Sequence, residues 1–396
     1  MEKKQYFLLV LGFLCLGWGG VRVAHYFLDK TPPTIELRGM EINGVYAGDI
    51  ACTLTGYDGY KIDSVSLLLD GEPLVEEYAV CRKQFAYPFV LSTDAFADGE
   101  HTLKVIVVDG SYRRNESVLE IPFFVDNVPL NLAWVTREKV FRVFQGKTLH
   151  VQFQASKPLG EATAEFLNGR YPCFQEREDA CIYEAFIPVK SDERPSEYPL
   201  SIRAIDRVGV KGVLEGRVQV VSFPFKSKKC ELGRSLTAAE RGALEPELAQ
   251  DLQIVFAQSH RVKRWKGLFE SPCHVNEQEL LFGTACFSPE KGYGRAELVD
   301  LIGDSNGAVW ASQDGVIALK KTYPKSGNII AIDHGFGIVS LYLNLGSFSS
   351  CTEGDSVTKG TVIGRLQKIA GRPQFSWGIR VNDIAVDPVQ WTHQGF

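Results

Sequence analysis

The feature that most constrains the fold is a β-strand pattern that occurs twice. Residues 101–109 read His-Thr-Leu-Lys-Val-Ile-Val-Val-Asp, and residues 198–206 read Tyr-Pro-Leu-Ser-Ile-Arg-Ala-Ile-Asp, at an offset of 198 − 101 = 97 residues. Short apolar runs separated by Asp, Gly and Pro surround both copies, which is typical of antiparallel β-sandwiches. A spacing of about 100 residues suits an immunoglobulin-like domain. We therefore expect a mainly β protein with two tandem immunoglobulin-like sandwiches, at residues 31–127 and 128–225.

Individual strands of the first copy can be placed from the same pattern. They are expected at residues 34–37, 64–69, 101–108 and 118–125, and Asp70-Gly71 is a turn signal after the second of them. The opening Thr31-Pro32-Pro33 and the strand that ends in Val-Asp resemble bacterial immunoglobulin-like repeats of exported proteins. Such domains are usually spacers or contact surfaces, and the fold alone assigns no chemistry.

The N-terminus predicts export. Lys3 and Lys4 precede an apolar run from Tyr6 to Gly20. No small-x-small cleavage site follows, so residues 1–28 are interpreted as an uncleaved signal anchor, with a cleaved signal peptide as the alternative. A lipid anchor on Cys15 is a weaker alternative. Lysines on the short side place that end in the cytoplasm and the bulk of the chain outside.

Charge and cysteine content narrow the functional class. The net charge of -5 and the pI near 5.9 give no basic field, so nucleic acid is not an expected partner. Outside the apolar run the chain has eight cysteines, an even set that an exported protein can oxidise. Spacing favours three disulfide bridges: Cys173–Cys181, Cys273–Cys286 and Cys52–Cys81. Their connectivity stays open, and buried free thiols are the alternative.

Residues 226–270 are expected to form a helical linker. Thr237-x-x-Glu240 is a capping-box signal, and Pro246 divides the helical segment into two pieces. The second piece carries an apolar stripe at helical spacing, which we expect to pack on a neighbouring domain. Its members are Leu248, Leu252, Val255 and Phe256.

The last third of the chain, residues 271–396, together with the entry segment just before it, carries a series of short motifs in a fixed order. They are Trp-x-Gly-x-Phe-x-x-Pro at 265–272, Gly-Ala-Val-Trp-Ala at 307–311, Asp-Gly-Val-Ile-Ala at 314–318, strand sequence into Asp-His-Gly at 328–335, Tyr-Leu-Asn-Leu at 342–345, Gly-x-x-Val-x-x-Gly-x-x-Ile-Gly at 354–364 and Val-Asp-Pro at 386–388. In combination these resemble the lysostaphin or LytM-type zinc metallopeptidase family. The resemblance implies a twisted antiparallel β domain with a groove that holds one zinc ion.

Carried over residue by residue, the resemblance implies an incomplete metal site. The aspartate of the family's His-x-x-x-Asp is Asp300, whereas its histidine position holds Ala296, or Glu297 if the loop slips by one residue. The histidine of Tyr-x-His-Leu is replaced by Asn344, and those of His-x-His by Gln374 and Ser376. In the family the zinc ligands are the histidine and aspartate of His-x-x-x-Asp and the second histidine of His-x-His. Of these three, only the aspartate remains here, and amide and hydroxyl groups are poor zinc ligands. We expect no metal, no cofactor and no catalytic residues.

Other side chains near the expected groove are assigned either to the hydrophobic core or to ligand contact. His334 is ordinary family sequence and is interpreted as structural. Trp310, Phe375 and Trp377 are either core residues or aromatic contacts for a sugar or peptide ligand.

The resemblance implies three functional hypotheses. The first is a single-pass protein of the bacterial inner membrane with a degenerate peptidase domain outside the cytoplasm, where it binds peptidoglycan or regulates a cell-wall hydrolase. The second is an active zinc peptidoglycan endopeptidase with a divergent site. The third is a structural interaction module of an envelope assembly.

Overall fold

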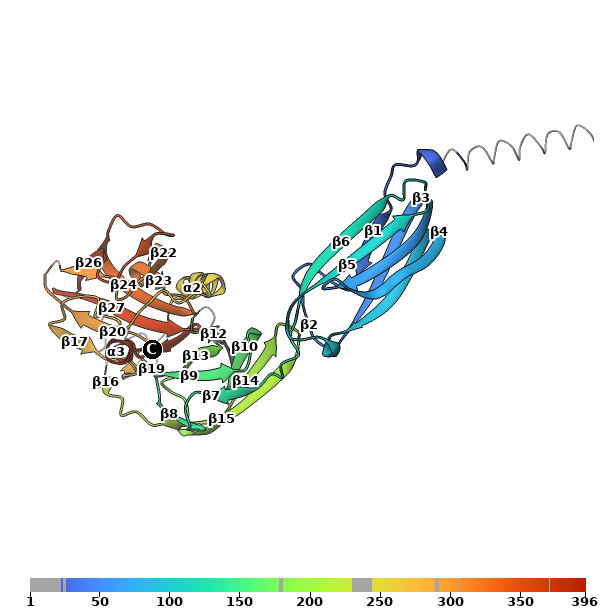
Figure 1. Ribbon diagram of the computed structural model, residues 1–396. Coiled ribbons are helices and arrows are strands. Elements are labelled where there is room, and N and C mark those ends of the chain that lie inside the picture. Colours follow the sequence, from blue (N-terminus) through green and yellow to red (C-terminus); the bar gives the residue numbers. More distant parts are fainter. Residues whose placement is uncertain are drawn as a thin grey trace, which may run out of the picture. The chain divides into compact units, whose positions relative to one another are not determined.

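The computed structural model describes residues 23, 26–177, 181–229, 244–288, 292–305, 307–369 and 371–396. The fold is mainly β, as expected, and the chain divides into two compact units, Met1–Pro129 and Leu130–Phe396 (Figure 1). Residues 1–22, which hold nearly all of the predicted anchor, lie outside the described residues. Within the described part of the chain, no helix has the length and apolar character needed to cross a membrane.

Unit 1 contains a six-stranded sheet in the order β1-β3-β5-β6-β2, with β4 on the other edge of β3. Its strands are β1 (Thr34–Arg38), β2 (Val45–Tyr46), β3 (Asp49–Leu69), β4 (Glu72–Ser92), β5 (Gly99–Asp109) and β6 (Glu116–Val125). Strand β3 pairs with β1 along its first half and with β5 along its second half. Because β3 pairs with strands on both sides along its length, all six strands of unit 1 belong to one sheet and not to two separate sheets.

Unit 2 begins with a sandwich of two sheets, ordered β11-β10-β14-β15-β8 and β12-β13-β9-β7. The strands are β7 (Leu132–Trp134), β8 (Val140–Phe144), β9 (Thr148–Ala155), β10 (Leu159–Phe166), β11 (Gly169–Pro172), β12 (Phe174–Gln175), β13 (Ile182–Pro188), β14 (Ser196–Asp206) and β15 (Lys211–Val221). The repeated motif lies on β5 of unit 1 and on β14 here.

The C-terminal part of unit 2 is built on a ten-stranded sheet with the path β17-β20-β27-β26-β24-β23-β22-β25, to which β21 and β28 are attached. Its strands are β17 (Glu277–Leu280), β20 (Val299–Ile302), β21 (Ala308–Trp310), β22 (Gly315–Tyr323), β23 (Gly327–Asp333), β24 (Ile338–Phe348), β25 (Ser356–Val357), β26 (Val362–Ile369), β27 (Arg372–Val381) and β28 (Ile384–Val386). A smaller sheet comprises β16 (Ser227–Lys229), β18 (Ala285–Ser288) and β19 (Gly292–Arg295), and the helices are α2 (Pro246–Gln258) and α3 (Pro388–His393).

The sandwich of unit 2 has its own hydrophobic cluster, but two of its aromatic side chains, Phe174 and Phe186, pack into the cluster of the C-terminal domain. Phe186 of β13 contacts Trp265 and Trp391, with ring centroids 5.5 and 6.1 Å apart, and Phe174 stacks on Phe336 at 3.9 Å. All five aromatic side chains are buried in the same cluster. The sandwich is therefore continuous with the C-terminal domain and does not act as a separate spacer.

Polar contacts fix the same junction. Lys147 pairs with Asp387 at 2.5 Å, and the Gln390 side chain bonds both the N–H and the carbonyl of Thr148, at 2.7 and 2.9 Å. Asp387 also caps α3, because its carboxylate accepts the Val389 N–H. The backbone N–H and carbonyl of Thr148, at the start of β9, are thus hydrogen-bonded by a side chain of α3.

A buried carboxylate lies between the sandwich and the segment after α2. Glu184 is 1% exposed and pairs with His150 at 2.8 Å and with Lys263 at 3.1 Å. Burial alone would raise the pKa of Glu184, but the His150 hydrogen bond and the Lys263 charge hold it below its ordinary value. This contact adds to the continuity of unit 2.

Two expectations for the connecting segment meet different outcomes. The apolar stripe does pack on a domain, since Leu248, Leu252 and Val255 of α2 are buried against the C-terminal sheet. The interpretation of residues 226–270 as a linker is wrong for its described part, because α2 and Trp265 belong to the C-terminal core. The capping box at Thr237 lies outside the described residues.

The three favoured disulfides are not formed. Cys52, Cys81, Cys173, Cys181 and Cys273 are free cysteines. Cys52 faces the core of unit 1 opposite Phe89, whereas Cys81 is exposed beside Arg82, which pairs with Ile62 much farther along β3. In the β12–β13 hairpin the register pairs Phe174 with Glu184, which leaves Cys181 displaced from Cys173.

The remaining favoured pair is separated by the sheet itself. Cys273 and Cys286 belong to two different hydrophobic clusters. Spacing along the sequence does not reveal such a separation.

Candidate functional site

Two of the predicted metal-site positions meet on neighbouring strands. Asp300 of β20 and Ser376 of β27 are Cα partners in the antiparallel ladder. The Ser376 hydroxyl donates a hydrogen bond of 2.6 Å to Asp300 Oδ1. Asp300 is 0% exposed and Ser376 is 1% exposed. The retained family aspartate is thus bonded to the side chain that replaces a family histidine.

The other three positions offer no matching donors. Ala296 is fully buried and has no donor atom, and its N–H bonds the Thr284 carbonyl at 3.0 Å. Gln374 is also buried and lies opposite Ile302, two residues along β20 from Asp300. Asn344 has a left-handed backbone with φ of 58°, and its N–H bonds the Ser326 carbonyl.

The face of the sheet that carries these positions is filled with apolar side chains. Along β20 the side chains alternate, so that Val299 and Leu301 enter one cluster while Leu298 enters the other. Asp300 therefore shares the face of Leu298, and Ala296 belongs to the same cluster. Among the described residues, Ala296 and Asp300 therefore lie within a packed core on this face.

Helix α2 covers this apolar face, and Figure 1 shows it against the C-terminal sheet. Leu248, Leu252 and Val255 pack in one cluster with side chains of β22, β23 and β24. Lys321 of β22 pairs with both Glu247 and Asp251, and the hydrogen bonds that its ammonium donates to Asp251 and Glu247 raise the pKa of Lys321 above its ordinary value. The helix is therefore attached to the sheet by an apolar stripe with ion pairs along its border.

These residues do not fit the zinc ion that active relatives of such a domain would carry. A catalytic zinc site needs three protein ligands and an open position for water. Here the Asp300 carboxylate already accepts a hydrogen bond from Ser376, Ala296 offers no ligand atom, and all three are buried. Glu297, the alternative to Ala296, pairs with Arg380 at 2.8 Å.

The three candidate aromatic contacts divide between core and surface. Phe375 and Trp377 are 0% and 2% exposed in the main cluster, so their interpretation as ligand contacts is wrong. Both follow the strand alternation that points them away from Ser376. Trp310 is half-buried, and its ring lies 5.0 Å from that of His274.

His334 is built into the core. Nδ1 donates to the Asp314 carbonyl at 2.7 Å, and Nε2 is hydrogen-bonded to Ser340 Oγ at 2.8 Å. The side chain is fully buried, and burial lowers its pKa to about 4. Both ring nitrogens are therefore engaged in structural hydrogen bonds.

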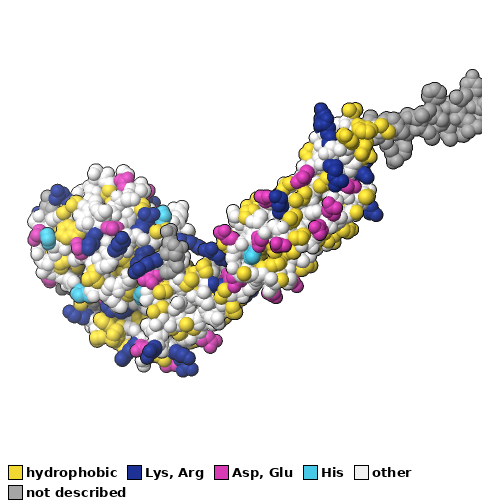
Figure 2. Space-filling view, viewed as in Figure 1, with side chains coloured by type: hydrophobic (Ala, Val, Ile, Leu, Met, Phe, Trp, Pro, Cys, Tyr) yellow, Lys and Arg dark blue, Asp and Glu magenta, His cyan; other side chains and the backbone are white. Residues whose placement is uncertain are grey.

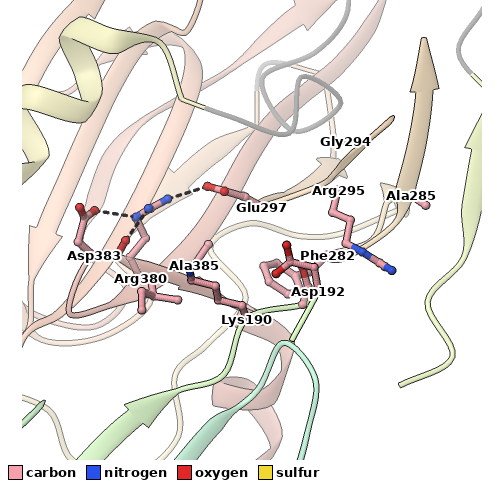
Figure 3. A pocket seen from close by; sticks show the side chains of 12 residues that line it. Lys190, Asp192, Phe282, Ala285, Gly294, Arg295, Glu297, Arg380, Asp383 and Ala385 are labelled. Carbon is pink, nitrogen blue, oxygen red and sulfur yellow. Dashed lines mark hydrogen bonds and ion pairs between the residues drawn. The ribbon is translucent and has the colours of Figure 1, made fainter. Parts of the chain in front are cut away.

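The sequence interpretation did not identify a cavity of about 630 Å³ between the sandwich and the C-terminal domain. Figure 3 shows Arg380 in its wall, bonded to Glu297 and to Asp383, while Arg295 lies farther along. Arg295 donates to the Gly283 carbonyl and lies over the Phe225 ring at 5.1 Å. The side chains that line this cavity come from segments far apart in the sequence, so no local motif marks it.

Comparison with known proteins identifies the C-terminal domain. Residues 295–388 match the model of Peptidase family M23, so this part of the chain is an M23-family domain. Among curated proteins, none matches the chain. The match begins one residue before Ala296 and ends with the Val-Asp-Pro motif.

Several solved structures are similar to parts of this chain, at low identity and with TM-scores below 0.5. A Pseudomonas aeruginosa protein assigned to peptidase M23 is 19% identical over 63% of this chain and 94% of its own, with a TM-score of 0.41. A chain of the SpoIIIAH and SpoIIQ complex is 20% identical over 31% of this chain and 98% of its own, with a TM-score of 0.27. Csd3 of Helicobacter pylori is 12% identical over 74% and 72%, with a TM-score of 0.31. The M23-family domain suggests a function related to the cell wall.

Proposed function

We propose that this is an anchored protein of the bacterial cell envelope whose M23-family domain is a binding module without peptidase activity. The observation that carries the proposal is the state of the metal-ligand face. Asp300 is bonded to Ser376 and fully buried, and α2 covers the apolar side chains of that face. The burial of these positions supports a domain that takes up neither zinc nor a muropeptide there.

A protein partner is favoured over a substrate peptide for the same reason. A peptidoglycan stem peptide would need the groove that α2 and its cluster fill. Recognition must then use outer surfaces of unit 2, where a sandwich packs against the M23-family domain in one compact unit. We expect the partner to be a cell-wall hydrolase or another envelope protein, and we expect no cofactor.

The anchoring and the location outside the cytoplasm rest on the sequence. The apolar run from Tyr6 to Gly20 follows Lys3 and Lys4 on its short side. By the charge rule the remainder of the chain lies outside the cytoplasm.

Binding assays test this function. The purified full chain is presented to peptidoglycan sacculi and, separately, to envelope amidases, and retention is compared with that of a heat-unfolded sample. We expect retention by a hydrolase, increased amidase activity and no cleavage of crosslinked muropeptides. Retention by neither would refute the binding role, and muropeptide cleavage would refute the loss of activity.

A further inference from the structure

An aromatic cluster lies at the end of unit 1 that holds residues 26–30. The Phe27 ring lies 4.9 Å from that of Tyr26 and 5.3 Å from that of Tyr112, and the Tyr60 ring is 6.2 Å from that of Tyr26. These rings are not covered by the rest of the unit, since Phe27 is 50% and Tyr112 is 65% exposed. Leu28, beside them, is 72% exposed. Side chains of this kind would normally be buried unless another surface contacts them.

The cluster is held in place by the backbone beneath it. The Tyr112 N–H donates to the Tyr26 carbonyl at 2.9 Å, which joins the segment before β1 to the loop between β5 and β6. That loop is fixed by the buried Asp109 carboxylate, which accepts hydrogen bonds from Ser111 and Asn115 at 2.7 to 3.1 Å. The exposed rings are therefore presented by an ordered part of the fold.

The exposed charges around the rings are mostly basic. Lys30, Arg113 and Arg114 are exposed, and Figure 2 shows dark blue and yellow side chains together at this end of unit 1. Two carboxylates of this end, Asp58 and Asp109, are 2% and 0% exposed. Asp29 is half-buried, Asp63 is paired with Arg114, and Glu116 at the start of β6 is exposed. An aromatic surface with a basic border results.

This combination matches the chemistry of a membrane surface. Tyr rings are enriched at the level of lipid headgroups, and Lys and Arg are attracted to anionic lipids. The apolar run ends at Gly20, six residues before Tyr26. Six residues span at most about 20 Å, so an anchored chain brings the cluster close to the headgroups.

We propose that this end of unit 1 rests on the bilayer and contacts anionic phospholipid headgroups. Phe27, Leu28 and Tyr112 enter the headgroup layer, while Lys30 and Arg113 pair with phosphates. The contact gives unit 1 a defined orientation on the membrane. The proposal rests on the membrane anchoring stated under the proposed function.

Site-specific photocrosslinking of the full chain in vesicles tests this contact. A benzoylphenylalanine residue replaces Tyr112, and a matched control replaces Ile42, which is 63% exposed in the loop between β1 and β2 of the same unit. The vesicles contain phosphatidylethanolamine and phosphatidylglycerol. We expect clearly more lipid adducts at position 112 than at position 42, because only the first of these positions lies within the proposed contact.

A charge variant separates specific contact from simple proximity. The substitutions Lys30→Glu and Arg113→Glu alter exposed side chains, and we expect them to lower the adducts at position 112 at least about fivefold. Vesicles of phosphatidylcholine alone should give the same low yield. Circular dichroism of the variant checks that it is folded, and Arg113→Lys should keep the wild-type yield.

The outcomes distinguish this contact from the anchoring itself. Equal adducts at positions 112 and 42, or adducts at 112 that do not respond to charge reversal, would overturn the proposed contact while leaving the anchor intact. A full chain that does not float with the vesicles after a carbonate wash would overturn the anchoring and this contact together.

Discussion

The buried pair of Asp300 and Ser376 gives the sharpest test of the view that a former metal position has become part of the core. Ser376→Ala removes the 2.6 Å hydrogen bond to Asp300 Oδ1 within a pair that is 0% and 1% exposed. Loss of a buried hydrogen-bond partner costs about 1–3 kcal/mol. We expect the free energy of unfolding of unit 2 to fall by that amount.

A double-mutant cycle measures the contact itself. Asp300→Ala removes the acceptor, and Ser376→Ala combined with it should show a coupling of about 0.5–3 kcal/mol. The exposed Ser356 of β25 is the matched control, and Ser356→Ala should change stability by less than about 0.5 kcal/mol.

Denaturant unfolding of the full chain, followed by tryptophan fluorescence and repeated with EDTA, provides the assay. All described tryptophans lie in unit 2, so their emission follows this unit. The curves should superimpose with and without the chelator. A stabilising effect of zinc on the wild type that Asp300→Asn abolishes would refute the reasoning, because Asp300 would then be a metal ligand.

Three further predictions concern the packing of unit 2. Leu252→Ala in α2, at a side chain that is 0% exposed, should lower the free energy of unfolding by about 2–5 kcal/mol in a urea titration, and an effect below about 0.5 kcal/mol would contradict the packing of α2 on the ligand face. Because His334 is held neutral, with a pKa near 4 against an ordinary 6.5, the unfolded chain binds the extra proton; stability should be full above pH 6.5 and fall by about 2 kcal/mol by pH 5, and His334→Asn should flatten that slope. The sandwich and the M23-family domain should unfold in one calorimetric transition, and Glu184→Gln should lower its free energy of unfolding by about 1–3 kcal/mol, whereas a separate transition for residues 130–221 would contradict the packing of the sandwich on that domain.

Strand sequence and motif order were enough to predict the β architecture and the M23-like domain. Alternating side chains such as those of Val299, Asp300 and Leu301 specify two faces, and glycine-containing turns fix where strands end. The register that places Asp300 opposite Ser376 follows from that alternation.

The covering of the ligand face could not be predicted in the same way. Helical spacing identified the stripe of Leu248, Leu252 and Val255, but the spacing of a stripe does not say which surface it meets. The same limit applies to Phe375 and Trp377, whose neighbours come from distant strands.

The cysteine pairs show a related limit. Closeness in sequence favoured Cys273 with Cys286, yet these side chains lie in clusters on different faces of the sheet. A disulfide needs Cα atoms within about 7 Å and facing side chains, and neither condition can be read from spacing.

The metal content and hydrolytic activity of the full chain test the central claim most directly. Protein purified without chelator is analysed for zinc by mass spectrometry and incubated with crosslinked muropeptides, beside Asp300→Ala. The account predicts less than about 0.1 zinc per chain, since a lone carboxylate is a poor zinc site, and no cleavage by either protein. Stoichiometric zinc and muropeptide cleavage that are both lost in Asp300→Ala would contradict it.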